Sequence, residues 1–216
     1  MINNLSEHNS YINQILFELR DKEIQKDRSK FRRNLEKLGS IMAYEVSKTL
    51  SYRAEKMETP LAPLTLQLPE SPVIAGVLRA AVPFMNGFIS VFDRADAGFI
   101  GAYRRENTEN IEIDLNYMAL PSTEDRVVIV VDPMLATGKS LVKAIDEIKK
   151  LGQARFFHLV CAIATPEGID YISGRLKNNQ YTIWAAAVDS HLDANSYIVP
   201  GLGDAGDLSY GEKLTL

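Results

Sequence analysis

The sequence predicts an α/β fold in which helices flank a central parallel sheet. From Arg126 onward, three apolar runs of strand length (RVVIVV, FFHLVCAIA and YTIWAAAV) alternate with two helix-like segments. A β-α-β-α-β order of this kind forms parallel strands with right-handed crossovers and helices on both faces of the sheet. The 216 residues, 46% of them hydrophobic, are enough for one substantial core. We therefore expect a single domain over residues 1–216.

Two amphipathic helices are expected in the N-terminal segment, residues 1–58. The stretch that follows, ETPLAPLTLQLPESP, breaks helical periodicity with its prolines and leads into the buried-strand run VIAGVL near Val73. The apolar residues at helical spacing are Tyr11, Ile12, Ile15, Leu16 and Leu19 in the first helix, and Phe31, Leu35, Leu38, Met42, Val46 and Leu50 in the second.

Residues 73–190 are expected to form the α/β core. Pro83 suits a helix start, GFIGAYR reads as a strand, and the alternation in NIEIDLNYM indicates a half-exposed strand or hairpin. A helix over residues 140–151, closed by Gly152, and another over PEGIDYISGRL complete the pattern. Residues 191–216 contain a glycine-rich stretch, IVPGLGDAGDLSYG, that fits no ordinary helix or strand.

Composition favours small-molecule partners. The chain has 28 acidic and 24 basic residues, a net charge of −4, so we expect neither nucleic acid nor a membrane surface as a partner. The single cysteine, Cys161, has no partner for an internal disulfide, and no run reaches the ~20 apolar residues of a membrane span. A cytoplasmic location is expected. The three histidines show no metal-ligand spacing.

The stretch VVIVVDPMLATGKSL combines a buried strand, an acidic loop and a helix start. Thr137, Gly138 and Ser140 lie where backbone N–H groups at a helix N-terminus can bind a phosphate. Asp132, at the strand end, can accept hydrogen bonds from sugar hydroxyls or approach a metal-bound group. The loop therefore predicts a phosphorylated sugar as ligand. TGKS also resembles the end of a P-loop, but Pro133 stands where that motif needs glycine.

A hydrophobic strand followed by D-x-x-x-x-T-G-x-S resembles the phosphoribosyl pyrophosphate (PRPP) signature of phosphoribosyltransferases. VVDPMLATGKS resembles the version in the uracil phosphoribosyltransferase family, as do LRDKEIQKDRSKFRRNLEKLGSIMAYE, LRAAVPFMNG, GAYR, PEGI and YIVPGLGDAGD, in the family's order. The resemblance implies a type I phosphoribosyltransferase fold with N-terminal helices and a small hood or hairpin. It implies transfer of phosphoribosyl from PRPP to uracil, giving UMP and pyrophosphate. It further implies Mg²⁺ carried by PRPP without direct protein ligands, and a homodimer or higher oligomer.

The resemblance also implies roles for individual residues. Breaking the bond from C1′ to pyrophosphate develops positive charge on the sugar and negative charge on the leaving group, which cations stabilise. Arg79, Arg104, Asp132 and Asp204 are the implied catalytic residues. Glycines at 201, 203 and 206 let backbone groups approach the edge of a base. The implied PRPP-binding residues are Arg79, Arg104, Asp132, Pro133, Met134, Leu135, Ala136, Thr137, Gly138, Lys139, Ser140 and Asp204, and the implied uracil-binding residues are Ile198, Gly203, Asp204 and Ala205.

Several positions depart from the family pattern. Lys139 stands where glycine is usual, Arg105 and Asn107 where an acidic pair is common, and SYGEK replaces a Phe-Gly-Thr ending. Regulation by GTP or another nucleotide is left open. Two other classes also stay open: a nucleotide-sensing, RNA-binding regulator on the same fold, which the net charge of −4 disfavours, and a P-loop nucleoside kinase, which Pro133 disfavours.

Overall fold

The structure, a computed structural model, describes residues 1–104, 113–177 and 179–213, with backbone only for 102–104 and 113–116. Its main sheet has the strand order β1-β10-β9-β7-β4-β5-β6, and β8 pairs with β9 beside this path. Every pairing is parallel except that of β5 with β6 at one edge. The strands are β1 (Ile2–Asn4), β4 (Val73–Leu78), β5 (Asp96–Arg104), β6 (Ile113–Ala119), β7 (Val127–Val131), β8 (Met134–Leu135), β9 (Phe156–Ala164) and β10 (Tyr181–Val188).

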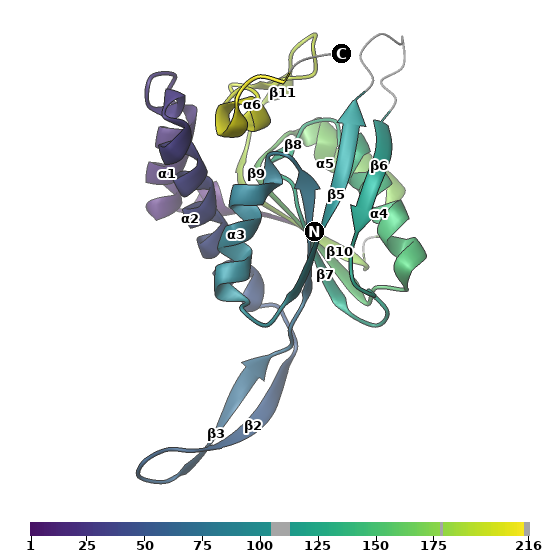
Figure 1. The fold of residues 1–216 in the computed structure, drawn as a ribbon. Helices are drawn as coiled ribbons and strands as arrows, with labels where there is room; N and C mark the ends of the chain where they lie inside the picture. Colours follow the sequence, from purple (N-terminus) through teal and green to yellow (C-terminus); the bar gives the residue numbers. More distant parts are fainter. Residues whose placement is uncertain (105–112, 178, 214–216) are drawn as a thin grey trace.

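Helices cover both faces of the sheet, which confirms the predicted architecture. In Figure 1, α1 (Tyr11–Arg20), α2 (Arg28–Ser47) and α3 (Ala81–Val91) lie on the left of the sheet, and α4 (Lys139–Ile148) and α5 (Pro166–Arg175) on the right. Alternate residues of β7 serve the two sides: Ile129 and Val131 pack in the core with α1 to α3, and Val128 and Val130 in the core with α4 and α5. A strand buried on both faces has to be apolar throughout, which explains the run VVIVV.

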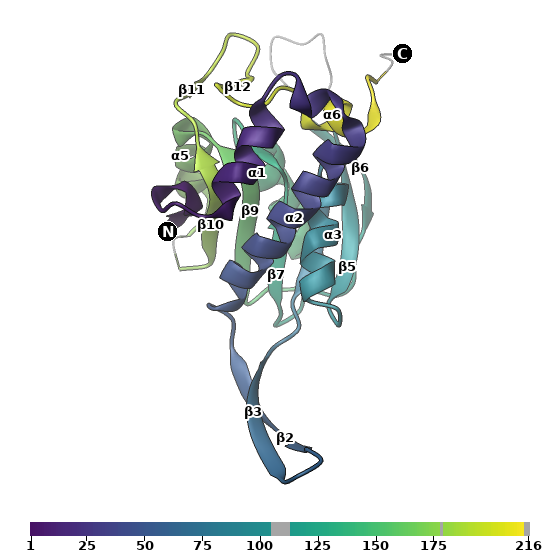
Figure 2. The same ribbon diagram turned by 90° about the vertical axis from the view of Figure 1, so that its left-hand side faces the viewer.

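Helices α2 and α3 pack against each other at very short range. A Cβ at Gly39 would lie 2.1 Å from the Phe84 carbonyl oxygen, and a Cβ at Gly87 would lie 2.1 Å from that of Glu36. Only glycine allows this approach of two backbones. Figure 2 shows α1, α2 and α3 side by side over the sheet. The N-terminal helices thus form one wall of the domain and reach the edge where the site lies.

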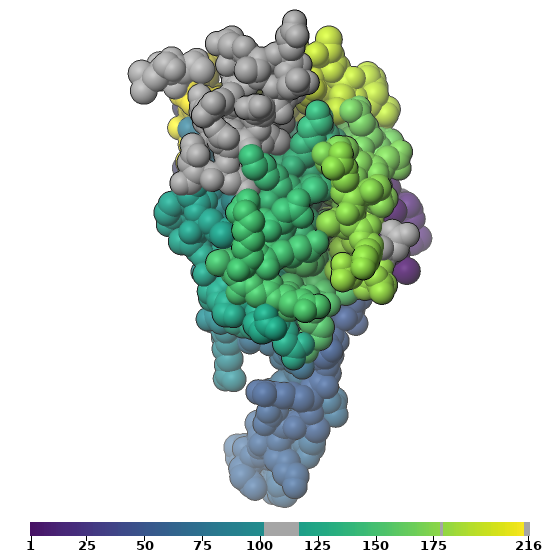
Figure 3. Space-filling view, turned by 90° about the vertical axis from the view of Figure 1, so that its right-hand side faces the viewer, coloured from purple at the N-terminus to yellow at the C-terminus, as the bar shows by residue number. Residues whose placement is uncertain are grey.

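The prediction of helices throughout residues 1–58 is wrong for its last part. Helix α2 ends at Ser47, and β2 (Tyr52–Glu58) pairs along its whole length with β3 (Pro63–Pro69) in an antiparallel hairpin. RAEKME consists largely of good helix formers, but it has no apolar stripe for a core to bury, so the backbone pairs locally with the following segment instead. The hairpin projects away from the body of the molecule (Figures 1 and 3).

The remaining C-terminal elements lie at the carboxyl ends of the parallel strands. An antiparallel pair, β11 (His191–Leu192) with β12 (Ile198–Val199), precedes the short helix α6 (Ala205–Tyr210). Three single-turn 3₁₀ helices are η1 (Leu5–Glu7), η2 (Ile24–Lys26) and η3 (Lys149–Leu151). In the described part of the chain, no helix has both the length and the apolarity needed to cross a membrane. Because β4, β7 and β10 are parallel strands of one sheet, the loops that leave them share one edge. Open α/β sheets bind their ligands at this edge.

Candidate active site at the carboxyl edge of the sheet

The phosphate loop, residues 132–140, is fixed to strand β9 through its backbone. The Asp132 amide donates to a β9 carbonyl at 3.0 Å, and the Pro133 carbonyl accepts from the amides of Ala162 and Ile163, each at 3.0 Å. Strand β8 continues this pairing alongside β9. Backbone hydrogen bonds therefore hold the first half of the loop in the sheet, and these bonds do not depend on its side chains.

Thr165 supports the phosphate loop from behind. It is fully buried, its amide donates to the Leu135 carbonyl at 3.1 Å, and its hydroxyl donates to the Ala136 carbonyl at 2.7 Å. The same hydroxyl caps helix α5 by accepting from the Gly168 amide at 3.1 Å. Gly168 packs so closely that a Cβ there would lie 2.3 Å from the Ala136 carbonyl oxygen. The loop and the start of α5 thus form one rigid unit.

The second half of the loop opens helix α4. Gly138 has a φ of +75°, which favours glycine, and this N-terminal position has no side-chain cap. Uncapped amides at a helix N-terminus favour an anion, whereas the Lys139 cation in the first turn is opposed by the helix dipole. The arrangement suits a phosphate. The pocket here is lined by Asp132, Met134, Leu135, Ala136, Thr137, Gly138, Ser140 and Leu141.

Asp132 lies in the wall of this pocket and is half-buried. One of its carboxylate oxygens accepts from the Met134 amide at 3.2 Å. Its charge also acts on Cys161: burial, and then the Asp132 carboxylate, raise the pKa of that thiol far above its ordinary value. Cys161 is therefore a neutral, buried side chain and not a nucleophile.

Arg79 follows β4 and reaches the C-terminal part of the chain. Its Nη2 lies 2.8 Å from an Asp207 carboxylate oxygen on α6, and its side chain is 44% exposed. The peptide bond between Leu78 and Arg79 is cis. The structure therefore joins Arg79 directly to the segment that contains Asp204. Sequence reasoning missed Asp207, because no local pattern identifies an ion pair across 128 residues.

Arg104 ends strand β5, next to β4, at the same edge of the sheet. Its side chain lies outside the described part of the structure. The predicted differences from the family at Arg105 and Asn107 also fall outside the described residues. The backbone position of Arg104 is compatible with its predicted role but does not test it.

Asp204 caps helix α6. Its Oδ1 accepts from the amides of Gly206 and Asp207 at 2.8 and 3.0 Å, and its Oδ2 lies 3.8 Å from the Lys213 ammonium. The capping bonds satisfy two orphan amides of the helix and fix the carboxylate at the start of α6. The structure thus gives Asp204 a structural role, in addition to the predicted role in binding PRPP.

The C-terminal loop, residues 191–206, contains the other predicted uracil-binding residues. Ile198 and Ala205 are buried, while Gly203 is exposed with a φ of +91°. Gly201 has a φ of +57°, and a Cβ there would lie 2.0 Å from the Ile198 carbonyl oxygen. None of the described residues accepts a hydrogen bond from the Gly203 or Ala205 amide. In this loop the backbone of Gly203 is exposed, and a Cβ there would meet only Leu208, at 3.9 Å.

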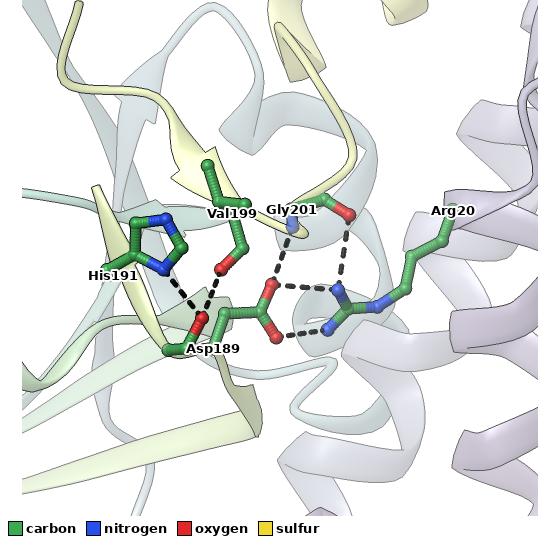
Figure 4. A network of polar contacts seen from close by, with 6 residues as sticks. Arg20, Asp189, His191, Val199 and Gly201 are labelled. Carbon is green, nitrogen blue, oxygen red and sulfur yellow. Dashed lines mark hydrogen bonds and ion pairs between the residues drawn. The ribbon is translucent and has the colours of Figure 1, made fainter. Parts of the chain in front are cut away.

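Arg20, which is half-buried, and Asp189, which is buried, are polar partners that sequence reasoning did not identify. The Arg20 guanidinium contacts both Asp189 carboxylate oxygens, at 2.7 and 2.8 Å, and also donates to the Gly201 carbonyl at 3.1 Å. Asp189 accepts from the Gly201 amide at 2.7 Å. Figure 4 shows these contacts between helix α1 and the C-terminal loop. Two signals were present in the sequence: both residues lie at element ends, and Arg20 belongs to the family-like stretch that begins LRDKEIQ.

Among the described residues, no group of three or more His, Cys, Asp or Glu side chains could hold a metal ion. His158 lies in the core, away from this edge, and its Nδ1 accepts from the Trp184 indole at 3.1 Å. Burial lowers the pKa of His158 to about 4. Since the indole can only donate, Nδ1 carries no proton and the ring is neutral. His158 is a structural residue.

Comparison with known proteins agrees with this geometry. Residues 6–211 match the family model described as uracil phosphoribosyltransferase. A protein of that name from Porphyromonas gingivalis is 43% identical over 212 residues, covering 97% of this chain and 98% of the relative. Another, from Pyrococcus furiosus, is 42% identical over 214 residues, with 97% and 90% of the two chains covered.

Solved structures share the fold of this chain. A protein from Aquifex aeolicus has a TM-score of 0.88 and 32% identity over 100% of both chains. An adenine phosphoribosyltransferase from Thermoanaerobacter pseudethanolicus, 12% identical with a TM-score of 0.52 over 82% of this chain and 99% of its own, shows the fold alone. With a family model matched over nearly its whole length, the chain belongs to the uracil phosphoribosyltransferase family.

Proposed function

We propose that this protein transfers the 5-phosphoribosyl group of PRPP to uracil, producing UMP and pyrophosphate in pyrimidine salvage. The observation that carries the proposal is the phosphate loop, where an uncapped helix start follows Gly138 in a pocket that also contains Asp132. Family membership supports the same reaction. We expect the preference for uracil to come from backbone groups of the C-terminal loop, which lies at the same edge of the sheet.

PRPP would bind with its 5′-phosphate on the backbone amides and hydroxyls of residues 137–140. Asp132 would accept hydrogen bonds from the ribose hydroxyls, because a carboxylate next to a phosphate site is suited to hydroxyl donors. The guanidinium of Arg79, and that of Arg104, would bind the pyrophosphate. Arg79 pairs with Asp207, so pyrophosphate would have to compete with that carboxylate.

In the reaction, the bond from C1′ to the pyrophosphate oxygen breaks and the leaving group takes the electron pair. Uracil N1 forms its bond to C1′ and releases its proton to solvent water. The sugar develops positive charge as the leaving group becomes more negative, so the arginines stabilise the transition state electrostatically. No protein nucleophile is needed, in agreement with the neutral, buried Cys161.

Mg²⁺ would arrive with PRPP, where it would neutralise charge on the pyrophosphate. Magnesium usually binds through one or two carboxylates together with substrate phosphates and retained waters. Here PRPP and water would supply the ligands, and Asp132 in the pocket wall would approach a metal-bound group without being a direct ligand. The chain itself would only orient the polyphosphate and the ribose.

Base selection would use backbone groups of the C-terminal loop. Uracil presents acceptor, donor and acceptor at O2, N3–H and O4, so the Ile198 carbonyl would accept from N3–H while the Gly203 and Ala205 amides would donate to the oxygens. The Asp193 amide donates to the Tyr197 carbonyl, so the next pair, Leu192 with Ile198, is a non-hydrogen-bonded one and the Ile198 carbonyl points away from β11. This carbonyl can therefore face a ligand.

The reaction is tested by incubating the protein with PRPP, Mg²⁺ and each free nucleobase while measuring nucleotide and pyrophosphate. We expect UMP from uracil and a preference over cytosine of ~10⁴ or more, because cytosine would leave buried polar groups unpaired. Small 5-substituents such as fluorine should be tolerated. Comparable rates with uracil and cytosine would refute the base-reading model. Phosphorylation of uridine by ATP without PRPP would instead support a kinase.

A homodimer or higher oligomer is part of this proposal. The β2–β3 hairpin extends from the body (Figure 2) and exposes Met57, Leu61, Leu64, Leu66 and Leu68. An isolated two-stranded hairpin is only marginally stable in water, so an apolar one is expected to pack against another chain. Sedimentation equilibrium at micromolar concentration tests this, and a monomer would contradict it.

A cytoplasmic location also belongs to the proposal. It is supported by the single cysteine, which is buried and free, since chains that persist in oxidising compartments usually use cysteines in disulfides. Nucleic acid and membranes are not expected as partners because the net charge is −4. Cell fractionation followed by the UMP-forming assay on each fraction would test the location.

A further inference from the structure

We propose that Arg20 and Asp189 are positioning residues that hold the C-terminal loop in the geometry that reads the base. The inference rests on the proposed function, because it concerns the uracil side of that reaction. Neither residue belongs to the predicted binding set. Both act through Gly201, which lies between Ile198 and Gly203 in the loop.

The ion pair has the geometry of a strong contact. Two guanidinium nitrogens of Arg20 meet the two Asp189 oxygens in a parallel, bidentate arrangement at 2.7 and 2.8 Å (Figure 4). The Arg20 and Asp189 side chains are 22% and 6% exposed, so the carboxylate is shielded from water and the guanidinium is partly so. Bidentate arginine–carboxylate pairs fix orientation as well as distance. Loss of Arg20 would leave the buried Asp189 carboxylate without its compensating charge.

The pair fixes both polar backbone groups of Gly201. Asp189 accepts from the Gly201 amide at 2.7 Å, and Arg20 donates to the Gly201 carbonyl at 3.1 Å. Gly201 lies against the Ile198 carbonyl, so closely that a Cβ would be 2.0 Å from that oxygen. The orientation of Gly201 therefore determines where the Ile198 carbonyl lies relative to the Gly203 amide.

Asp189 is itself anchored to the sheet. It follows β10 directly, and its amide donates to the Ala164 carbonyl at the end of β9, at 2.8 Å. Arg20 is the last residue of α1, where the helix dipole favours a cation. The network thus connects the sheet, helix α1 and the C-terminal loop at one point.

A second contact, from Gln25 in the segment after α1, supports the C-terminal loop at Leu202, the residue after Gly201. With its amide oriented as its neighbours require, the Gln25 nitrogen donates to the carbonyls of Leu19 and Leu202, at 3.0 and 2.9 Å. Helix α6, which follows the loop, is held separately by Arg32, which donates to the Ser209 carbonyl at 2.6 Å. The Arg20–Asp189 pair is therefore specific to the stretch around Gly201, and Asp204 at the start of α6 keeps its own supports.

The test compares four variants with the wild type: Arg20→Ala, Arg20→Lys, Asp189→Asn and the control Glu18→Ala. Glu18 lies on the same helix and is 20% exposed, but it pairs with Lys30 at 3.3 Å and does not reach the loop. Steady-state kinetics with varied uracil and varied PRPP are combined with thermal unfolding. Amide hydrogen exchange of residues 198–203 reports loop order without reference to activity.

We expect Arg20→Ala and Asp189→Asn to raise KM for uracil about tenfold or more, while KM for PRPP changes little. Exchange of the loop amides should accelerate relative to the sheet. Arg20→Lys should be intermediate, because lysine keeps the charge but lacks the planar fork. Glu18→Ala should lower the melting temperature without changing KM for uracil, as a merely structural contact would.

The outcomes distinguish failure of the proposed function from failure of the positioning role. If the wild type makes no UMP from uracil, the proposed function fails. If the wild type is active and both conservative variants, Arg20→Lys and Asp189→Asn, keep the wild-type KM for uracil and loop exchange, the positioning role is refuted. Equal rises in KM for uracil and PRPP, or the same effect in Glu18→Ala, would refute it as well, since the contact would then serve only general stability.

Discussion

Gly168→Ala should weaken PRPP binding indirectly. The new side chain would displace the phosphate loop from its buried side and would not contact the ligand. The new Cβ would lie 2.3 Å from the Ala136 carbonyl oxygen and 3.0 Å from that of Leu135. Both neighbours are backbone atoms, so no side chain can rotate away. Ordinary contact is about 3.5 Å, so the loop and helix α5 must separate by roughly 1 Å. Such overpacking costs about 1–3 kcal/mol of folding free energy.

A shift of about 1 Å in a positioning element can cost ~10²-fold in rate. We therefore expect kcat/KM for PRPP to fall by about that factor in Gly168→Ala. The matched control is Gly174→Ala on the same helix, where a Cβ meets nothing within 4 Å. That variant should keep wild-type kinetics and gain about 0.5–1 kcal/mol, because alanine is the better helix former.

The assay is urea unfolding of both variants together with kinetics at varied PRPP and saturating uracil. Wild-type kcat/KM for PRPP in a folded Gly168→Ala protein would refute the reasoning, because it would mean that the loop need not be held against α5. Loss of activity in Gly174→Ala would also contradict it, since the effect would then belong to the helix as a whole.

Three further predictions concern other parts of the chain. Arg79→Ala or Arg104→Ala should lower turnover ~10²-fold or more with the fold intact, as expected for loss of a preorganised charge; near-normal rates in both would remove the pyrophosphate assignment. A phosphate or sulfate in a crystal should lie against the backbone of residues 135–140, and an ordered anion bound only elsewhere would count against the loop. The pKa of His158, lowered by burial to about 4, should make stability depend on pH. The unfolded chain takes up this proton below about pH 6.5 and the folded chain only near pH 4, so stability is complete above pH 6.5 and falls, by up to about 3 kcal/mol, as the pH drops toward 4. Urea unfolding at pH 7.5 and 4.5 should show a smaller loss in His158→Gln, and an equal loss in both proteins would contradict the prediction.

Sequence alone was sufficient for the parallel sheet and for the strand, loop and helix start around residues 132–140. Strands such as VVIVV and FFHLVCAIA are buried on both faces, so their composition is constrained throughout and can be recognised without a partner. The phosphate loop was equally clear, because a strand, a helix start and the residues between them are contiguous. Such elements can be predicted because the residues that determine them are close together in the sequence.

The tertiary structure decided the features that depend on distant partners. Residues 52–58 have helical propensity but pair with β3, and the short strand β1 is defined only by its register against β10. The contact of Arg20 with Asp189 joins residues 169 positions apart. A charged side chain at an element end looks the same in sequence whether it is solvated or paired. Only the folded chain shows that the half-buried Arg20 pairs with the buried carboxylate of Asp189, and this bidentate contact makes the arginine a support for the loop.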